Sequence, residues 1–277
     1  MTVARVISRS VANVIEQLEL DGDLLVTVHR LAAVMHHVGL DDDKTQARRL
    51  ASPRLAYELQ RDGWLGRLRT RHTWEFLRAR GGAYGSGDRY IEFRAQRSVD
   101  PTWSGVLAME SAASVLGLAQ RLPTREVVAL PPNAPFPKAL TGEWRYVRVE
   151  LPEAGLTTVN GLPSWTLEGL IVGIAARPSA YKDVAGLGHW LPEAAADADV
   201  HTIITLLKGM RLATRQRAAY LLGAAGNDDA RAAVVGVYPA TETAWLGPRV
   251  AGEGVFDAET KVNDTLLHPY LSVGTGS

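Results

Sequence analysis

The stretch RDGWLGRLRTRHTWEF, residues 61–76, interleaves cationic residues with apolar ones and contains two runs that favour β-structure. Gly63 is a stop signal for a preceding helix, and the runs at residues 64–69 and 73–78 contain aromatic and apolar residues at strand-like positions. Only three residues separate the two runs. The stretch therefore predicts a β-hairpin directly after a helix, with positive charge gathered toward its tip at Arg67, Arg69, Arg71 and His72.

The residues before this hairpin alternate between helical and strand-like patterns. Apolar residues recur at helical spacing in residues 3–19, and residues 24–28 form a short run of strand-forming residues. A second helical pattern spans residues 31–38 and ends at Gly39. The hairpin is thus preceded by a helix, a strand and a further helix.

Ser52 and Pro53 divide the last segment before the hairpin in one of two ways. Ser52 is a good N-cap and Pro53 suits the first turn of a helix, which predicts a helical piece at residues 43–51 and a separate helix at residues 52–62. Alternatively, residues 44–62 form one helix that is kinked at Pro53. Both interpretations give the order of elements of a winged helix-turn-helix.

Residues 53–62 have two chemically different faces on a helical wheel. Leu55, Ala56 and Leu59 share one side, and the other side carries Arg54, Tyr57, Glu58 and Arg61. A DNA-recognition helix needs an apolar back and a front rich in donors, because arginine bonds guanine bidentately in the major groove. An ordinary solvated helix face has the same pattern, so this helix alone does not decide the function.

The net charge of zero conceals an uneven distribution. Residues 44–97 contain 13 Lys and Arg against 5 Asp and Glu, whereas residues 1–43 contain 3 against 7 and residues 98–277 contain 14 against 18. A basic segment of this kind is typical of nucleic-acid binding. A charged edge that prevents aggregation is the alternative for the hairpin, but it does not require such an imbalance. We therefore expect the wing arginines, with Arg48 and Arg49 upstream, to hold phosphates, which guanidinium groups bind in a planar fork.

The charge balance and the order of elements predict two domains. Residues 1–97 would form the winged helix-turn-helix domain, with a glycine-rich loop at residues 81–90 and a short strand at residues 90–95. Residues 98–277 would form a mixed, helix-rich domain, which makes the whole chain an α+β protein. Its expected strands are 125–130 and 143–151, its expected helices are 104–118, 166–176, 200–210, 213–225 and 228–237, and the tail from Pro239 is expected to be irregular.

Composition and motifs exclude several kinds of chemistry. The chain has no cysteine, so disulfides, zinc-ribbon sites and thiol nucleophiles are excluded. It contains no phosphate-binding loop, dinucleotide-binding fingerprint, zinc-protease motif or serine-hydrolase motif. No apolar run approaches the ~20 residues of a membrane helix. We expect a non-enzymatic, soluble, cytoplasmic protein with no cofactor, no metal and no membrane partner.

A second basic feature lies in the stretch KGMRLATRQRAAYLLGAAG, residues 208–226. Arg211, Arg215 and Arg217 precede a run of apolar residues on the expected helix. Two interpretations stay open for these arginines: a solvated first turn of the helix, or a basic groove for a second partner or ligand.

Three segments of the second domain resemble a known family. They read ESAASVLGL at residues 110–118, GLPSWTLEGLIVGIAARPSAY at residues 161–181, and ATRQRAAYLLGAAG at residues 213–226. Together with the winged helix-turn-helix order, they resemble the AbiEi-type antitoxins of type IV toxin–antitoxin systems. The chain departs from the family pattern at Arg217–Tyr220, which reads RAAY where RLGY is expected, and Glu168 is shifted relative to the usual acidic position.

The resemblance implies a protein with two roles and no catalytic activity. The first domain would bind double-stranded DNA at inverted repeats in its own promoter, and the second would counteract a nucleotidyltransferase-type toxin. The positions that match the DNA-contacting part of the pattern are Arg54, Tyr57, Arg61, Arg67, Arg69 and Arg71. A ligand-sensing winged-helix regulator without a toxin, and an enzyme with an unrecognised site, remain as alternatives.

Overall fold

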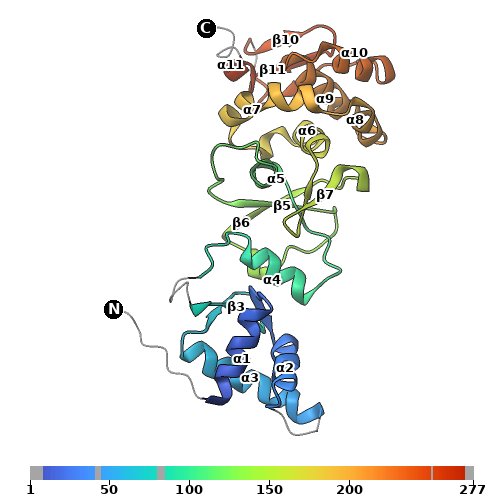
Figure 1. Cartoon of the computed structure of the whole chain (residues 1–277). Helices are drawn as coiled ribbons and strands as arrows, with labels where there is room; N and C mark the ends of the chain where they lie inside the picture. The colour runs from blue at the N-terminus through green and yellow to red at the C-terminus, as the bar shows by residue number, and fades with distance from the viewer. Residues whose placement is uncertain (1–8, 41–44, 80–84, 251, 272–277) are drawn as a thin grey trace. The chain divides into compact units, whose positions relative to one another are not determined.

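The structure, a computed structural model, describes residues 9–40, 45–79, 85–250 and 252–271 (Figure 1), without the side chains of residues 9, 10 and 45–51. The chain divides into two compact units, residues 1–103 with 137–140, and residues 104–136 with 141–277. Each unit has its own cluster of buried apolar side chains.

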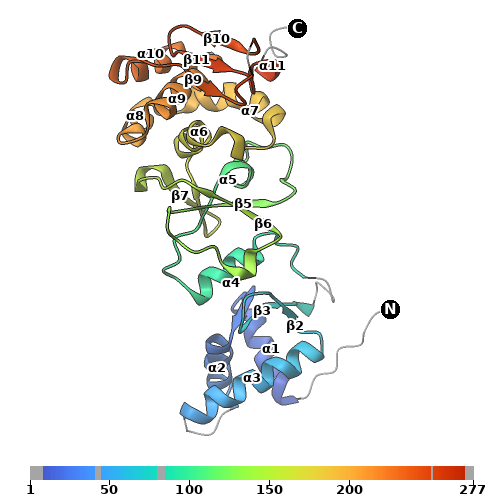
Figure 2. The ribbon, with the colours of Figure 1, turned by 180° about the vertical axis from the view of Figure 1, so that it is seen from behind.

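The first unit begins with the expected order of helix, strand, helix, helix and hairpin. Its elements are α1 (Arg9–Leu20), β1 (Leu25–Thr27), α2 (Val28–His37), α3 (Thr45–Arg61), β2 (Leu65–Arg67), β3 (Thr73–Phe76) and α4 (Ile91–Val99). The strands pair in the order β1-β3-β2. Figures 1 and 2 show α1, α2 and α3 on one side of this small sheet and α4 on the other.

The core of the first unit is built from the apolar stripes of its helices. Buried side chains recur at intervals of three or four residues, so that each helix turns one face inward. The core residues are Val14, Ile15 and Leu18 of α1, Leu31, Val34 and Met35 of α2, Leu55, Ala56 and Leu59 of α3, and Val26, Trp64, Leu65 and Phe76 of the strands and the turn after α3.

Helix α3 is a single helix with Pro53 inside it. The interpretation of Ser52 as the N-cap of a separate helix is therefore wrong, and the alternative of one helix is confirmed. Ser52 is fully buried, and the apolar face of Leu55, Ala56 and Leu59 continues beyond it. Packing of this face offsets the loss of the hydrogen bond that a proline cannot donate.

The strand expected at residues 90–95 is wrong, because Ile91–Val99 form helix α4. The Asp88 carboxylate accepts hydrogen bonds from the Tyr90 N–H at 2.9 Å and from Arg94 Nε at 2.8 Å, which stabilises the start of the helix. Phe93 is fully buried, and its ring lies edge-on to that of Trp103 with 5.1 Å between centroids. Packing of Phe93 onto Trp103 thus favours a helix over the expected strand.

The second unit contains a larger sheet with the strand order β6-β5-β4-β8-β7 and a small sheet with the order β10-β11-β9. Figures 1 and 2 show α5 and α6 between the larger sheet and the layer formed by α7, α8 and α9. The elements are β4 (Val106–Leu107), α5 (Met109–Val115), β5 (Glu126–Leu130), β6 (Trp144–Arg148), β7 (Leu156–Val159), β8 (Leu162–Trp165), α6 (Leu167–Ala176), α7 (Val184–Asp197), α8 (Val200–Leu207), α9 (Leu212–Ala224), α10 (Asp228–Val237), β9 (Ala244–Leu246), β10 (Val255–Asp257), β11 (Val262–Asp264) and α11 (His268–Leu271).

Helix α6 is the central helix of this unit, and every residue from Gly169 to Ala175 is buried. The Thr166 hydroxyl caps it by accepting the Gly169 N–H at 3.0 Å. Gly173 lies against the ring of Trp165, so closely that a Cβ atom at this position would be 2.3 Å from the ring carbon Cζ3. The absence of a side chain at residue 173 is therefore what allows the indole to pack under α6.

Two expectations for the second unit are wrong. Residues 104–118 do not form one helix, since β4 pairs with β5 and β8 before the chain turns at Met109, whose φ is +50°, into α5. The tail after Pro239 is not irregular, since it contains β9, β10, β11 and α11. The fully buried Asp264 organises this tail by accepting the N–H groups of Leu266 and Leu267, both at 2.7 Å.

Candidate nucleic-acid interface

Helix α3 presents the two faces that its sequence predicts. Leu55, Ala56 and Leu59 are buried in the core. Arg54, Tyr57 and Arg61 are exposed, and Tyr57 keeps 67% of its surface accessible to solvent. A tyrosine with so large an exposed fraction does not contribute to the core of the unit. Its ring is therefore available to a partner of the helix.

Two exposed arginines of α3 already have acidic neighbours. Arg54 Nε lies 3.4 Å from Glu58 Oε1, and Arg61 Nε donates to Asp62 Oδ1 at 2.9 Å. The hydrogen bond to Asp62 raises the pKa of Arg61 above its ordinary value. Exposed ion pairs are weak, so a phosphate could replace either carboxylate at small cost.

The hairpin has an exposed basic tip. Arg67 is opposite Trp74 in the last pair of the ladder, and residues 68–72 connect the strands. Arg67, Arg69 and Arg71 are all exposed. Among the residues that the structure describes, the side chains of Arg67 and Arg71 make no hydrogen bond or ion pair, so their charges are available to an anion. His72 adopts a φ of +59°, which turns the chain back into β3.

A polar contact joins the hairpin to α3. The indole Nε1 of Trp74 donates to Gln60 Oε1 at 3.2 Å. Because Trp74 is opposite Arg67 and Gln60 adjoins Arg61, this contact fixes the basic side of the hairpin relative to the end of the helix. The sequence contains no pattern that pairs these two residues.

The hairpin tip is also held from α4. One carboxylate oxygen of Glu92 accepts the Arg69 N–H at 2.7 Å, and the other accepts the Thr70 N–H at 3.3 Å and the Thr70 hydroxyl at 3.2 Å. Consecutive backbone N–H groups of this kind form an anion-binding nest. Glu92 lies 22 residues from Thr70 in the chain, and sequence reasoning did not identify it because its segment was interpreted as a strand.

Arg48 and Arg49 belong to the first part of α3, and their side chains lie outside what the structure describes. They are nevertheless on the same helix as Arg54, Tyr57 and Arg61. One helix, α3, therefore contains all five of these positions.

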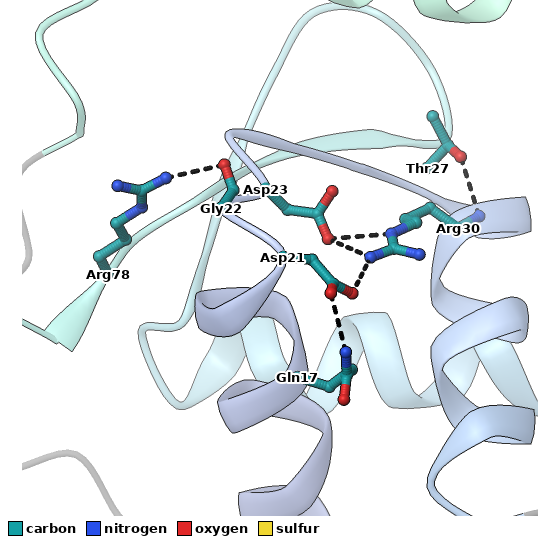
Figure 3. A network of polar contacts seen from close by, with 7 residues as sticks. All are labelled: Gln17, Asp21, Gly22, Asp23, Thr27, Arg30 and Arg78. Atoms are coloured by element: carbon teal, nitrogen blue, oxygen red, sulfur yellow. Dashed lines mark hydrogen bonds and ion pairs between the residues drawn. The ribbon is translucent and has the colours of Figure 1, made fainter.

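A second polar network links α1, β1 and α2 (Figure 3). Arg30 Nε and Nη2 donate to Asp23 Oδ2 at 2.9 and 2.8 Å, and Nη2 also pairs with Asp21. The Gln17 side chain donates a hydrogen bond to Asp21. This bond and the one from Arg30 lower the pKa of the Asp21 carboxyl. Arg30 is thus committed to structure, unlike Arg67 and Arg71 of the hairpin tip.

Two other features are absent from the part of the chain that the structure describes. In residues 9–40, 45–79, 85–250 and 252–271, no group of three or more His, Asp or Glu side chains is placed to hold a metal ion. No helix within these same ranges is long and apolar enough to cross a membrane.

Residues 104–224, from just before β4 to the end of α9, match the family model of the AbiEi antitoxin C-terminal domain. This segment, named the AbiEi domain after that match, covers less than half of the chain. The AbiEi domain therefore includes the larger sheet and the central helix α6. The resemblance expected from residues 110–118, 161–181 and 213–226 is confirmed for this part of the chain.

The chain is also similar to a solved structure, the crystal structure of the RV2827C protein from Mycobacterium tuberculosis. The two share 26% sequence identity with a TM-score of 0.81, over 98% of this chain and 97% of that one. The likeness supports the α+β fold on both sides of the AbiEi domain. No curated protein matches the sequence.

Proposed function

We propose that this chain is a DNA-binding transcriptional autorepressor that is also the antitoxin of a type IV toxin–antitoxin system. The AbiEi domain supports an antitoxin role. The proposal of DNA binding depends on one observation. Two basic surfaces, the exposed face of α3 and the hairpin tip, are linked by the hydrogen bond between Trp74 and Gln60.

In the proposed complex, α3 enters the major groove of double-stranded DNA. Arg54, Tyr57 and Arg61 reach base edges or phosphates from its exposed face, because the buried face holds the helix on the core. The hairpin then acts as a wing along the backbone, where Arg67, Arg69 and Arg71 bind phosphates without reading sequence. Arg48 and Arg49 add phosphate contacts from the start of the helix.

The ion pairs of Arg54 and Arg61 allow a DNA phosphate to replace a carboxylate. Glu58 and Asp62 pair with Arg54 and Arg61 at the exposed surface of the unit. A phosphate then takes the place of each carboxylate, in the bidentate geometry that guanidinium groups prefer. The operator would be the inverted repeats of the chain's own promoter.

The proposed partner of the AbiEi domain is a nucleotidyltransferase-like toxin. Neutralisation would take place in the cytoplasm and requires no catalysis by this chain. The proposal draws on the family of residues 104–224.

DNA binding is tested by titrating the full chain onto its own upstream region at several salt concentrations. Neutralising about 4–6 phosphates gives a slope of log affinity against log salt of roughly −4 to −5. A scrambled duplex of equal length is the control for sequence preference. Salt-independent binding, or no binding at low salt, would contradict the proposal.

The antitoxin role is tested by expressing the chain together with a nucleotidyltransferase-like gene encoded next to it. Growth should recover in proportion to the amount of this chain. A truncated chain of residues 104–277 tests whether the second unit suffices. Growth arrest that persists at high levels of the folded full chain would argue against an antitoxin.

A further inference from the structure

The second unit contains a strongly basic cavity of about 490 Å³. Residues from the end of β6, the end of α6 and the start of α9 line it. Its described lining includes one carboxylate, that of Glu150, and four arginines, which are Arg148, Arg177, Arg211 and Arg217. The sequence distributes these arginines over 70 residues, and the fold brings them to one concavity.

The two arginines in the walls of the cavity are held by carbonyl groups and not by carboxylates. Arg148 Nη1 donates to the Pro131 carbonyl oxygen at 2.8 Å. Arg217 donates from Nε to the Trp245 carbonyl at 2.7 Å and from Nη1 to the Ala175 carbonyl at 3.1 Å. The Arg148 guanidinium also lies over the Tyr146 ring, 4.9 Å from its centroid. These contacts orient both guanidinium groups, and no carboxylate of the described residues forms an ion pair with either of them.

The two other arginines are exposed on the lining of the cavity. Arg177 follows the last residue of α6, and Arg211 precedes the first residue of α9. Within the described part of the chain, neither side chain makes a hydrogen bond or an ion pair. Both can therefore turn toward a ligand without breaking a contact of the fold.

The charge of Arg217 lies in surroundings that disfavour it. Its side chain is half-buried, and this burial, together with the charge of Arg249, lowers its pKa below the ordinary value for arginine. Removing a charge from water without an opposite charge nearby is unfavourable. A bound anion would offset this cost.

The start of helix α9 adds positive electrostatic potential to the cavity. No side chain caps this helix of 13 residues, and its first turn contains no acidic residue. The first N–H groups of a helix lack partners within the helix and favour negative charge. Ala213, in the first turn, is part of the cavity lining.

We propose that this cavity binds the polyphosphate of a nucleoside di- or triphosphate. Phosphate oxygens match the planar forks of the arginines. Pro132, Val149 and Met210 supply apolar lining for a base or ribose. The volume lies within the range of about 300–1,000 Å³ that is usual for small-molecule sites.

A small ligand fits these residues better than a nucleic-acid strand does. The four arginines line one concavity of about 490 Å³, which is the size of a small-molecule site. A second cavity of about 380 Å³ also contains basic residues, but two carboxylates line it and one of them, Glu110, pairs with Arg145 at 2.8 Å. Its positive charge is thus partly neutralised within the fold.

The test is calorimetric titration of the full chain with ATP, GTP, pyrophosphate and adenosine. The triphosphates should bind, and pyrophosphate should bind more weakly because it lacks the base. Adenosine should not bind measurably. Replacing both Arg177 and Arg211 by alanine should weaken triphosphate binding about tenfold or more, because charge-assisted hydrogen bonds are lost. Glu150→Gln should strengthen it, because the substitution removes the opposing charge.

Control variants locate the site. Arg121→Ala removes an exposed arginine from the second cavity, and the pair Arg67→Ala and Arg71→Ala removes the basic hairpin tip. Triphosphate affinity should be unchanged in both, and thermal melting should show that every variant is folded. The site does not depend on the DNA-binding proposal, since none of its residues lies in the first unit.

Several outcomes would overturn the proposal. The first is that no triphosphate binds to the folded chain. The second is that Arg121→Ala or the hairpin pair abolishes binding while the Arg177 and Arg211 pair leaves it intact. Equal affinity for pyrophosphate and ATP would refute a nucleotide ligand. Tighter binding of a short RNA with the same number of phosphates would show that the cavity serves a strand.

Discussion

The backbone N–H of Arg69 donates to the carboxylate of Glu92 over 2.7 Å, so a residue of α4 holds the tip of the hairpin. The Thr70 N–H and hydroxyl bind the other oxygen of the same carboxylate. The hairpin is therefore supported at two points, by Glu92 at its tip and by Gln60 at Trp74. Its basic side chains project from a backbone that is already ordered.

Replacing Glu92 by alanine should release the tip. Hydrogen exchange of the Arg69 and Thr70 amides should accelerate by about tenfold or more, because each loses a hydrogen bond to a charged acceptor. The amide of Phe76, which donates to the Leu24 carbonyl at 2.9 Å, should exchange as before. Unchanged exchange at residues 69 and 70 would mean that Glu92 does not hold the tip.

Replacing both Arg67 and Arg71 by alanine should weaken binding to all duplex sequences alike. Phosphate contacts contribute affinity without base preference, so the magnitude of the salt slope should fall by about two. Arg121→Ala, an exposed arginine of the second unit, is the matched control and should leave affinity unchanged. Altered sequence preference at constant overall affinity would reverse the role assigned to the wing.

Arg54→Ala should instead change sequence preference. Arg54 lies on the exposed face of α3, and a lost bidentate contact to a base costs about 1–3 kcal/mol of discrimination at one position. Measuring the affinity for a set of single-base operator variants would reveal the relaxed position. If the variant lost affinity uniformly across the set, Arg54 would be a phosphate contact.

Gly173→Ala should destabilise the second unit. The added Cβ would overlap the Trp165 ring, and overpacking of this kind costs about 1–3 kcal/mol. The matched control is Gly236→Ala in α10, where no atom lies within 4 Å of the added Cβ and alanine should be neutral or stabilising. Thermal unfolding compares the two. Equal melting temperatures for both variants would show that the contact with Trp165 relaxes freely.

Asp21 should contribute an acid-dependent part of the stability. Its pKa in the folded chain is below the ordinary 3.8, first because of the hydrogen bond from Gln17 and then because of that from Arg30. Since the folded pKa is lower than the unfolded one, the stabilisation is present above the unfolded pKa and is lost as the pH falls through the folded pKa.

Asp21→Asn should therefore reduce the free energy of unfolding at neutral pH and converge with the parent at low pH. Gln17→Ala, which removes the first donor, should raise the pKa of Asp21 toward the ordinary value in a carboxyl-carbon NMR titration. A pKa of Asp21 that is insensitive to Gln17 would contradict this account of the network in Figure 3.

The first unit was largely predictable because its signals are local. The apolar spacing in α2 and α3, and the short basic hairpin, predict their elements directly. The start of α4 was missed, although Asp88 before the segment and Glu92 in its first turn are typical of a helix N-terminus. The alternation of Tyr90, Ile91, Phe93 and Ala95 obscured this signal.

In the second unit, the sequence indicates one hairpin strongly but contains no signal for two of the short strands. Asn160 and Gly161, both with positive φ, form the turn between β7 and β8, and this dipeptide is a strong indicator of a hairpin. By contrast, β9 and β11 have only three residues each and pair in parallel across the chain. Strands this short show no period, because partners distant in sequence determine them.

Some residues of the candidate site can be predicted from local sequence, and others cannot. The exposed face of α3 follows from helical spacing alone, whereas the supports at Gln60 and Glu92 depend on how the hairpin packs. The basic cavity could not be predicted either. The sequence indicates a basic turn at Arg211 and Arg217, but Arg148 and Arg177 reach the same place only because the fold brings the ends of β6 and α6 to the start of α9.

The contact between Gly173 and Trp165 has a consequence for engineering and for the divergence of this domain. Each of the two residues limits which amino acids the other position accepts. A side chain at position 173 becomes admissible only when a smaller ring or an aliphatic residue replaces the indole at position 165. Libraries that vary this helix should therefore randomise the two positions together, since a single substitution at position 173 always meets the indole of Trp165.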